Sequence, residues 1–393
     1  MNPDPVVILS ARRTPVGAFQ GALASLTAPQ LGAAAVKAAL ADAGTAAAHV
    51  DEVILGCVLA AGIGQAPARQ AALGAGIASS VPATTVNKMC GSAMRAVMLA
   101  ADQILAGSAA VIVAGGIESM SNAPYLLPKA RAGYRMGNQE VLDHMFFDGL
   151  QSPWDGQLMG CFAEATAAKY GFTRQAQDEF AAESLRRALA AVAGGAFAAE
   201  IAPVAAKTRK GEAVIDTDET PFTLDAAKIP TLKPAFKKDG TVTAASSSGI
   251  SDGAAALVLA RESFARSLGL RPLARILGYA SYAREPEWFT LAPVGAMQKL
   301  LSQLKWQAAD VDLYEINEAF AVVTMAAMQD LKLDHGAVNV NGGACALGHP
   351  IGATGARLMT TLIHALRARG KQRGIASLCI GGGEATAMAI ELA

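Results

Sequence analysis

The sequence has few aromatic and few charged residues. Aromatic side chains make up 5% of its 393 residues and charged side chains 17%, whereas roughly 25% charged residues are usual in soluble domains. Hydrophobic residues nevertheless account for 52%, and the chain includes 39 glycines. This composition excludes a disordered chain and predicts a large core built from small aliphatic side chains.

Neither sign of charge is in excess, because 33 Lys and Arg residues balance 33 Asp and Glu residues. Binding of nucleic acid or of an anionic membrane along an extended face requires a basic surplus. We therefore expect a small-molecule partner, no nucleic acid and no membrane.

Long hydrophobic runs are also missing. The longest uncharged apolar stretch, residues 104–117, has 14 residues and contains glycines, which is short of the ~20 residues that a membrane-spanning helix needs. The first residues lack the basic start and long apolar core of a signal peptide. A cytoplasmic location is the expectation.

The cysteines lie far apart and form no Cys-x-x-Cys pair. They are Cys57, Cys90, Cys161, Cys345 and Cys379. An odd number at such separations argues against a disulfide framework, a zinc site or a redox centre. We expect no metal and no cofactor, and the simplest role of each free thiol is to fill the core.

Residues 121–248 differ from the rest of the chain. They hold 12 of the 21 aromatic residues, whereas residues 20–124 hold none. The segment is predicted to be an insertion with a helix at residues 174–193, and such a segment can cover a ligand. The flanks alternate β-branched and Ala-rich runs, as is typical of α/β layers around a mainly parallel sheet.

The two flanks resemble each other. Residues 50–57 (VDEVILGC) align with residues 311–318 (VDLYEINE), and residues 111–118 align with residues 377–384, which sets Val113 against Cys379. The same order at similar separations favours an internal duplication interrupted by the insertion. The alternative is that glycine-rich strand ends look alike by composition alone.

Cys90 is a candidate nucleophile. It follows an extended run at residues 81–87 and precedes apolar residues at helical spacing. At such a strand-to-helix turn, the free N–H groups and the helix dipole are expected to lower the pKa of the thiol. Gly91 would let a substrate approach the backbone closely. The alternative is a small thiol packed beneath the helix.

His349 and Cys379 have comparable settings. A lone histidine is usually structural, but His349 is held between Gly348 and Pro350 at the entry to a second predicted helix. Cys379 ends a predicted buried strand before the glycine triplet 381–383, whose N–H groups can face a ligand. A thiol there could act as a base beside an oxyanion site. The glycines do not match a dinucleotide or phosphate-binding fingerprint.

Five motifs, in the right order, carry a resemblance to a known family. They are residues 86–92 (VNKMCGS), 116–124 (GIESMSNAP), 317–320 (NEAF), 348–350 (GHP) and 379–383 (CIGGG). Along essentially the whole chain the sequence resembles the thiolase family, and within it the branch of the acetyl-CoA acetyltransferases.

The resemblance implies an α/β thiolase fold with duplicated βαβαβαββ halves, an αβαβα layered core and an inserted loop domain. The implied units are an N-terminal half at residues 1–120, the loop domain at 121–248, the completion of the N-terminal half at 249–271, and a C-terminal half at 272–393. A homodimer or homotetramer is implied as well.

The resemblance also implies roles. Cys90 would take an acyl group from a CoA thioester while His349 accepts its proton, and Cys379 would act as acid and base in condensing two acetyl-CoA to acetoacetyl-CoA plus CoA, or in the reverse thiolysis. The N–H groups of Cys90 and Gly381 would form one oxyanion site, and His349 with a water on Asn317 the other. CoA thioesters are then substrates rather than cofactors.

The implied CoA contacts are Ser248, Met159, Ala319 and Phe320. Lys207, Arg209 and Lys210 are weaker candidates for the nucleotide phosphates, since charge runs are usually solvated. Two departures put the CoA contacts in doubt: Leu158 stands where biosynthetic thiolases have histidine, and Phe222 falls where an adenine-site arginine is expected.

The acyl chain length is open at this point. Phe289 belongs to a bulkier loop than the family usually has; it could restrict the acyl chain, or the loop could sit differently and admit a longer one.

The alternative functions are a thiolase for longer 3-ketoacyl-CoA and a non-enzymatic acyl-CoA or lipid-binding relative. Ketoacyl synthases and hydroxymethylglutaryl-CoA synthases share the fold but lack the second cysteine.

Overall fold

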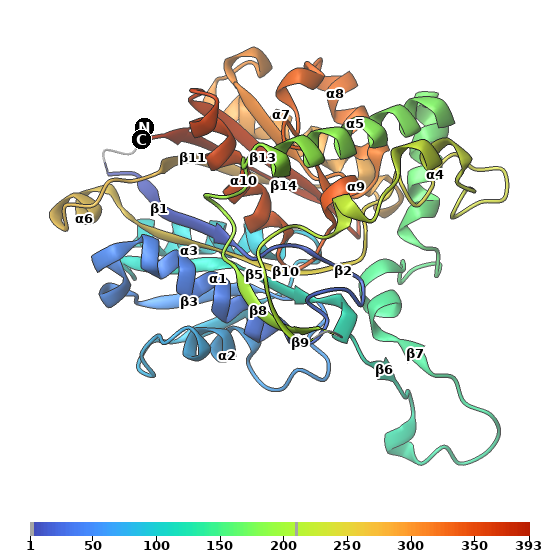
Figure 1. Cartoon of the computed structure of the whole chain (residues 1–393), viewed down its shortest axis with the longest axis horizontal. Helices are drawn as coiled ribbons and strands as arrows, with labels where there is room; N and C mark the ends of the chain where they lie inside the picture. The colour runs from blue at the N-terminus through green and yellow to red at the C-terminus, as the bar shows by residue number, and fades with distance from the viewer. Residues whose placement is uncertain (1–3, 209–210) are drawn as a thin grey trace.

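The computed structural model describes residues 4–208 and 211–393. Arg209 and Lys210 lie outside the described residues, so their predicted phosphate contacts stay predictions. Within the described residues, ten strands form one mixed sheet that consists of two half-sheets. Figure 1 shows the first 120 residues in blue to teal and the C-terminal half in orange and red.

The first half-sheet has five strands in a row and a short sixth strand beside them. In spatial order they are β1 (Val6–Arg13), β10 (Ser251–Arg261), β5 (Val111–Ser119), β3 (Glu52–Gly56) and β4 (Ala83–Val86), and the short β2 (Gly17–Ala18) pairs with β10. Strands β3, β4 and β5 are parallel, whereas β10 runs antiparallel to both β1 and β5.

The second half-sheet repeats this plan. Its strands are β11 (Ala274–Ala283), β14 (Glu384–Leu392), β13 (Arg373–Ile380) and β12 (Leu313–Ile316). Strands β12 and β13 are parallel, and β14 is antiparallel to both neighbours. The half-sheets join where Val7 and Ile8 of β1 pair with Arg275 and Ala274 of β11.

Helices cover both half-sheets in layers. The helices are α1 (Ala28–Asp42), α2 (Pro67–Gly74), α3 (Ser92–Ala106), α6 (Glu262–Ser267), α7 (Ala292–Leu304), α8 (Ala321–Leu331), α9 (Ala344–Leu347) and α10 (Thr354–Ala368). Apolar residues of α3 and α10 share one core with residues of both half-sheets. A second core joins α1 and α2 to the outer face of the first half-sheet, and a third joins α7 and α8 to that of the second. The predicted αβαβα layering is confirmed.

The two halves are built around equivalent aspartates. Asp51 precedes β3 and accepts a hydrogen bond from the N–H of Val111 (3.0 Å). Asp312 precedes β12 and accepts one from the N–H of Arg373 (2.9 Å). Each carboxylate thus ties the start of one parallel strand to the start of the next, and the duplication is confirmed.

The predicted alignment of residues 111–118 with residues 377–384 was wrong by four residues. Since Val111 is equivalent to Arg373, Val113 is equivalent to Ile375 and not to Cys379. Sequence comparison matched Gly115 and Gly116, which lie inside β5, with glycines that lie beyond the end of β13. Glycine occupies these positions of β5 because the neighbouring backbone leaves no room for a side chain. A Cβ at Gly116 would lie 2.1 Å from the carbonyl oxygen of Gly352.

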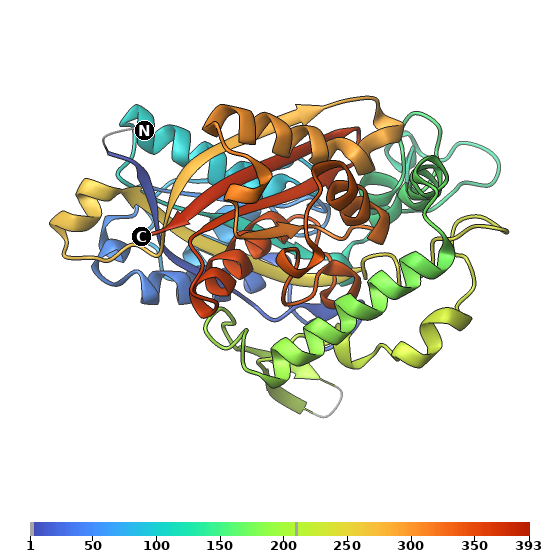
Figure 2. The ribbon, with the colours of Figure 1, turned by 90° about the horizontal axis from the view of Figure 1, so that it is seen from above.

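The inserted segment lies along one end and one side of the core (Figure 2). Its elements are β6 (Tyr125–Leu126), β7 (Leu142–Asp143), α4 (Met159–Tyr170), α5 (Arg174–Ala193), β8 (Val204–Thr208) and β9 (Gly211–Ile215). The predicted helix at residues 174–193 is α5, which Thr173 caps by accepting a hydrogen bond from the N–H of Ala176. The predicted domain boundaries stay predictions, although β10, after the insertion, returns to the first half-sheet.

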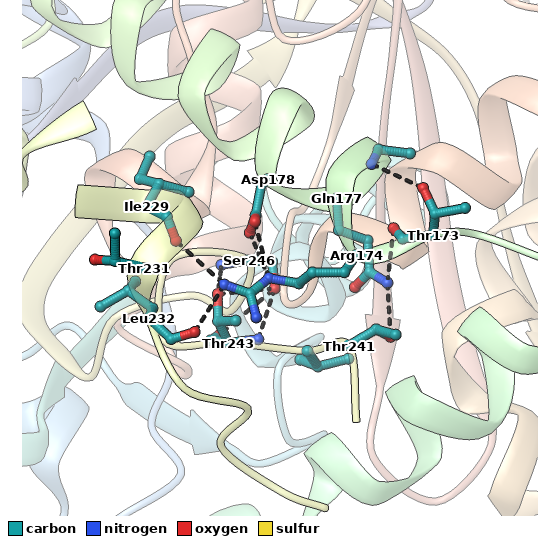
Figure 3. Close-up of polar contacts among 12 residues, drawn as sticks. Thr173, Arg174, Gln177, Asp178, Ile229, Thr231, Leu232, Thr241, Thr243 and Ser246 are labelled. Carbon is teal, nitrogen blue, oxygen red and sulfur yellow. Dashed lines mark hydrogen bonds and ion pairs between the residues drawn. The ribbon is translucent and has the colours of Figure 1, made fainter. Parts of the chain in front are cut away.

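Arg174 at the start of α5 anchors the later part of the insertion. Its guanidinium pairs with Asp178 (2.8 Å) and donates to the carbonyl oxygens of Ile229 (3.2 Å) and Leu232 (2.8 Å) (Figure 3). This contact fixes residues 229–232 against the helix. In the described part of the chain, no helix has the length and apolar character to cross a membrane.

Candidate active site

Cys90 occupies the predicted turn between β4 and α3. The turn is tight: the N–H of Gly91 donates to the carbonyl oxygen of Lys88 (3.0 Å), and the N–H of Lys88 donates to Ser92 Oγ (2.8 Å). Met89 has a φ of 46°, which is uncommon for a residue with a side chain and indicates local strain. The turn places the thiol at the N-terminal end of the helix that lies between the half-sheets.

The predicted direction of the Cys90 pKa shift was wrong. Burial raises the pKa of the thiol to about 11, and nearby Glu118 adds to the rise. The backbone N–H groups of Gly381 and of Cys90 itself lower the pKa, but they do not offset the loss of solvent. The resting thiol is therefore protonated at neutral pH and needs a base.

Cys379 lies at the end of β13, next to Cys90. It is fully buried, and burial, followed by the neighbouring Cys90, raises its pKa well above the usual range. The next residue, Ile380, packs on Gly91: a Cβ at Gly91 would lie 2.4 Å from Ile380 Cδ1. Glycine at position 91 thus lets the two cysteine-bearing segments, one from each half, approach each other.

His349 lies between two polar side chains. Its Nε2 is 3.4 Å from Asn317 Nδ2, and its Nδ1 is 2.6 Å from Thr354 Oγ1. Burial and, less strongly, the positive charge of Arg357 lower its pKa to about 3. The imidazole is therefore neutral at physiological pH and able to accept a proton.

The hydrogen bonds of Thr354 assign the tautomer of His349. Thr354 Oγ1 donates to the carbonyl oxygen of Pro350 (2.9 Å), so it accepts from the ring. The proton is then on Nδ1, and the free lone pair is on Nε2, where the amide of Asn317 donates to it. Thr354 was missed by sequence reasoning, because nothing in the GHP motif shows which side chain contacts the ring.

Glu118 lies in the second motif, residues 116–124, but no role was predicted for it. Its fully buried carboxylate accepts hydrogen bonds from the N–H groups of Val58 (3.1 Å), Leu59 (3.2 Å) and Gly352 (2.9 Å). It thus joins the loop after β3 in the first half to the loop that carries His349 in the second. Desolvation raises its pKa to about 7. The signal available in the sequence was an acidic residue directly after the apolar run of residues 111–117.

A second buried carboxylate, Glu318, connects the insertion to the site. It accepts hydrogen bonds from Ser184 Oγ on α5 (2.7 Å) and from Asn339 Nδ2 (2.8 Å). The backbone provides a further connection, because the N–H of Ser248 donates to the carbonyl oxygen of Ala319 (3.0 Å). The segment around Asn317 is thereby fixed on both sides.

An apolar cavity of about 200 Å³ opens onto these groups. Three of the predicted catalytic residues line it, and so do all four predicted CoA contacts: Cys90, His349 and Gly381, with Met159, Ser248, Ala319 and Phe320. Asn317 and Cys379 are buried beside His349 and Cys90 rather than on the cavity wall. The site therefore combines two thiols, a neutral imidazole and backbone N–H groups.

Of the remaining residues named from the sequence, two line the cavity and two do not. Leu158 and Phe289 line the cavity, and Phe289 packs edge-on against Phe162 with ring centroids 6.3 Å apart. Phe222 does not line it, and 63% of this residue is exposed. Lys207 is an exposed residue of β8 whose N–H donates to Ser25 Oγ, away from the cavity wall. Among the residues that the structure describes, no group of three or more His, Cys, Asp and Glu side chains could hold a metal ion.

The layered, duplicated fold and the two neighbouring thiols at the junction of its halves define the class to which the molecule belongs: α/β proteins with a cysteine–histidine site facing an apolar cavity. Comparison with known proteins specifies the family. The model for the thiolase N-terminal domain matches residues 6–263, and that for the thiolase C-terminal domain matches residues 270–392. The chain belongs to the thiolase family.

Similar proteins are found over the full length. The chain is 54% identical to an acetyl-CoA acetyltransferase of Escherichia coli, over 98% of each protein. It is 51% identical to an acetyl-CoA acetyltransferase of Cupriavidus necator, over 98% of this chain and 99% of the relative. The crystal structure of the Acat5 thiolase from Ascaris suum in complex with coenzyme A has a TM-score of 0.94 at 43% identity, and covers 99% of this chain and 100% of that one.

Proposed function

We propose that the protein is an acetyl-CoA acetyltransferase that condenses two acetyl-CoA to acetoacetyl-CoA plus CoA and catalyses the reverse thiolysis. Full-length relatives of this name at 54% and 51% identity support the activity. The observation that carries the mechanism is the meeting of Cys90, Cys379 and the neutral His349 at one apolar cavity.

In the first half of the reaction, Cys90 becomes acylated. Because its thiol is protonated at rest, Nε2 of His349 takes the proton as sulfur attacks the thioester carbon of acetyl-CoA. The backbone N–H groups of Gly381 and Cys90, which lower the pKa of the Cys90 thiol, would receive the oxygen of the tetrahedral intermediate. Its collapse expels the CoA thiolate, which takes the proton back from His349.

In the second half, the neutral His349 takes the proton of the Cys379 thiol, and the resulting thiolate removes a proton from the methyl carbon of a second acetyl-CoA. The carbanion attacks the acetyl carbon on Cys90, the carbon–sulfur bond breaks, and the Cys90 thiolate takes the proton from His349. The enolate oxygen would lie near His349 and a water held by Asn317, whose Oδ1 is buried and lacks a hydrogen-bond partner in the protein. No metal or redox group enters any of these steps.

A short acyl group suits the cavity. The cavity has about 200 Å³ and must also take the end of the pantetheine arm, and Phe289 is part of its wall, whereas ligand pockets usually span about 300–1,000 Å³. We therefore favour the four-carbon substrate over longer 3-ketoacyl-CoA. The pantetheine arm would pass Ser248 and Met159 toward the insertion.

We also propose a homodimer or homotetramer in the cytoplasm. Large apolar side chains are exposed on the segment around β6 and β7: Tyr125 (68%), Leu127 (56%), Met136 (76%) and Val141 (56%). An apolar patch of this kind is typical of a surface that another subunit covers. Light scattering on the purified protein measures the assembly directly, and a monomer would contradict the proposal.

The test of the activity is cleavage of acetoacetyl-CoA on addition of CoA. We expect turnover by the wild-type protein, no turnover and no acyl-enzyme with Cys90→Ala, and acylation without condensation with Cys379→Ala. Mass spectrometry of the intact protein after exposure to acetyl-CoA detects the acyl group. Near wild-type turnover by Cys90→Ala would refute the mechanism.

The substrate is tested separately by thiolysis rates across 3-ketoacyl-CoA from four to sixteen carbons. We expect the highest kcat/KM at four carbons. A maximum at eight carbons or more would assign the protein to the long-chain thiolases, and binding without any turnover would favour a non-enzymatic acyl-CoA-binding protein.

A further inference from the structure

One ion pair connects the two halves beside the reacting sulfur. Lys88 Nζ pairs with the carboxylate of Glu384, and the side chains are 24% and 38% exposed. Lys88 belongs to the turn of the N-terminal half and Glu384 to β14 of the C-terminal half. Lys88 lies in the first motif, but neither charge has a role in the proposed reaction, and neither residue lines the cavity.

Lys88 is part of the turn that presents Cys90. Its N–H donates to Ser92 Oγ (2.8 Å), and its carbonyl oxygen accepts from the N–H of Gly91 (3.0 Å). Because both backbone groups of Lys88 are used within the turn, a force on its side chain is transmitted to Cys90, two residues further on.

Glu384 closes the loop that carries Gly381. It pairs with Ile380 across β13 and β14, so the loop consists of three glycines. Gly382 and Gly383 have φ values of 95° and 90°, and glycine is the residue that loses most conformational freedom when it is ordered. The loop has no side chain of its own to hold it. On one side the N–H of Arg284 donates to the carbonyl oxygen of Gly383 (2.8 Å), and the residues at the two ends of the loop help to position the N–H of Gly381.

The turn that carries Cys90 and the glycine loop at residues 381–383 lie close together, with few side chains between them. Gly91 packs directly on Ile380, Cys90 and Gly381 line the same cavity, and the backbone N–H of Gly381 lowers the pKa of the Cys90 thiol. Ile380 thus provides the apolar contact between the loops, and the Lys88–Glu384 pair provides the charged one. A separation of a few tenths of an ångström here would weaken an N–H contact on which the oxyanion depends.

We propose that Lys88 and Glu384 are positioning residues, and that their ion pair sets the distance between the Cys90 sulfur and the N–H of Gly381. The catalytic consequence rests on the proposed function. The geometric consequence does not, because the same N–H stabilises the Cys90 thiolate in the free protein. Loss of the pair therefore changes the chemistry at sulfur and leaves the CoA contacts alone.

The experiment compares wild type, Glu384→Gln, Lys88→Met and the charge-reversed double variant Lys88→Glu/Glu384→Lys. We expect each single variant to lower kcat for acetoacetyl-CoA thiolysis by about tenfold, less than the ~10²-fold or more that loss of a whole oxyanion donor costs, with KM unchanged. The second readout is the rate of Cys90 alkylation by iodoacetamide against pH. Its midpoint should move to higher pH in both single variants, and the double variant should restore both readouts.

The matched control is Asp42→Asn. It removes the Arg12–Asp42 pair, whose side chains are 19% and 47% exposed and which lies outside the cavity wall. We expect this variant to keep the wild-type kcat and alkylation profile. Thermal melting of each variant separates a local change from unfolding.

Each remaining outcome has one meaning. Wild-type kcat and an unshifted alkylation profile in Glu384→Gln would overturn the positioning role, as would equal losses in Asp42→Asn. A wild-type protein without thiolysis would refute the proposed function instead, and a shifted alkylation profile in Glu384→Gln would then still support the geometric role of the pair.

Discussion

Replacement of Thr354 by valine tests how the histidine is prepared to act as a base. Valine has nearly the shape of threonine but no hydroxyl oxygen. In the wild-type protein Nδ1 of His349 is 2.6 Å from Thr354 Oγ1, and the valine variant would lose this contact. Either the Nδ1–H is left buried without a partner, or the proton moves to Nε2. In the second case Nε2–H faces the N–H group of Asn317 Nδ2, so that two donors meet.

The magnitude follows from the burial of the ring. His349 is 5% exposed, and a buried donor without a partner costs ~1–3 kcal/mol. In the transition state the ring becomes an imidazolium, whose Nδ1–H interacts with Thr354 more strongly than the neutral ring does. At about 1.4 kcal/mol per tenfold in rate, the acylation of Cys90 should slow roughly 5- to 150-fold.

The assay is stopped-flow acylation of Cys90 by acetyl-CoA, with steady-state thiolysis for kcat and KM. The loss should fall on kcat, because Thr354 does not line the cavity. Thr354→Ser keeps the hydroxyl and should stay within about twofold of wild type, since it retains the hydrogen bond. A Thr354→Val variant with wild-type acylation would refute the tautomer assignment.

Three further predictions concern the thiol, the contact between the halves and the cavity. Because burial raises the pKa of Cys90 to about 11, its alkylation by iodoacetamide should keep rising above pH 9; a plateau by pH 8 would contradict this. Gly91→Ala should lower kcat by at least tenfold, because its Cβ would lie 2.4 Å from Ile380 Cδ1, and Ile380→Ala in the same chain should restore part of the rate; no rescue would argue against this contact. Phe289→Leu should raise kcat/KM for six-carbon relative to four-carbon 3-ketoacyl-CoA by about tenfold, in line with one or two methylenes in an apolar pocket; an unchanged ratio would place the acyl chain elsewhere.

The positions of the thiols and of His349 could be predicted because each lies at a local transition. Strand ends, helix starts and glycines mark such points within a few residues of sequence. The relation between the positions could not be derived in this way, since Cys90 and Cys379 meet only when the two halves pack. Their assignment to one site came from the resemblance, and the structure brings them together.

What could not be predicted depends on surroundings that are distant in sequence. The pKa of Cys90 shifts upward because residues from several segments exclude water, and a helix start alone does not reveal this. The role of Thr354 depends on where its hydroxyl hydrogen goes, and that of Glu118 on N–H groups from both halves. The strand alignment failed for a related reason: glycine marks close packing in β5 but a loop after β13, and composition does not distinguish the two.

The apolar lining that keeps Cys90 protonated also suits the intermediate that the proposed reaction needs. An acyl-enzyme that met bulk water could be lost to hydrolysis before a second acetyl-CoA arrived, so the cavity must exclude water. Exclusion of water disfavours a free thiolate, and the site offsets this by placing a neutral base and two N–H groups at the sulfur rather than a fixed positive charge. A permanent cation would stabilise the resting thiolate as much as the transition state and so gain little rate. In the proposed reaction the N–H groups of Gly381 and Cys90 would stabilise negative charge where it develops next to them, first on sulfur and then on oxygen, and the packing of the two halves would hold them there.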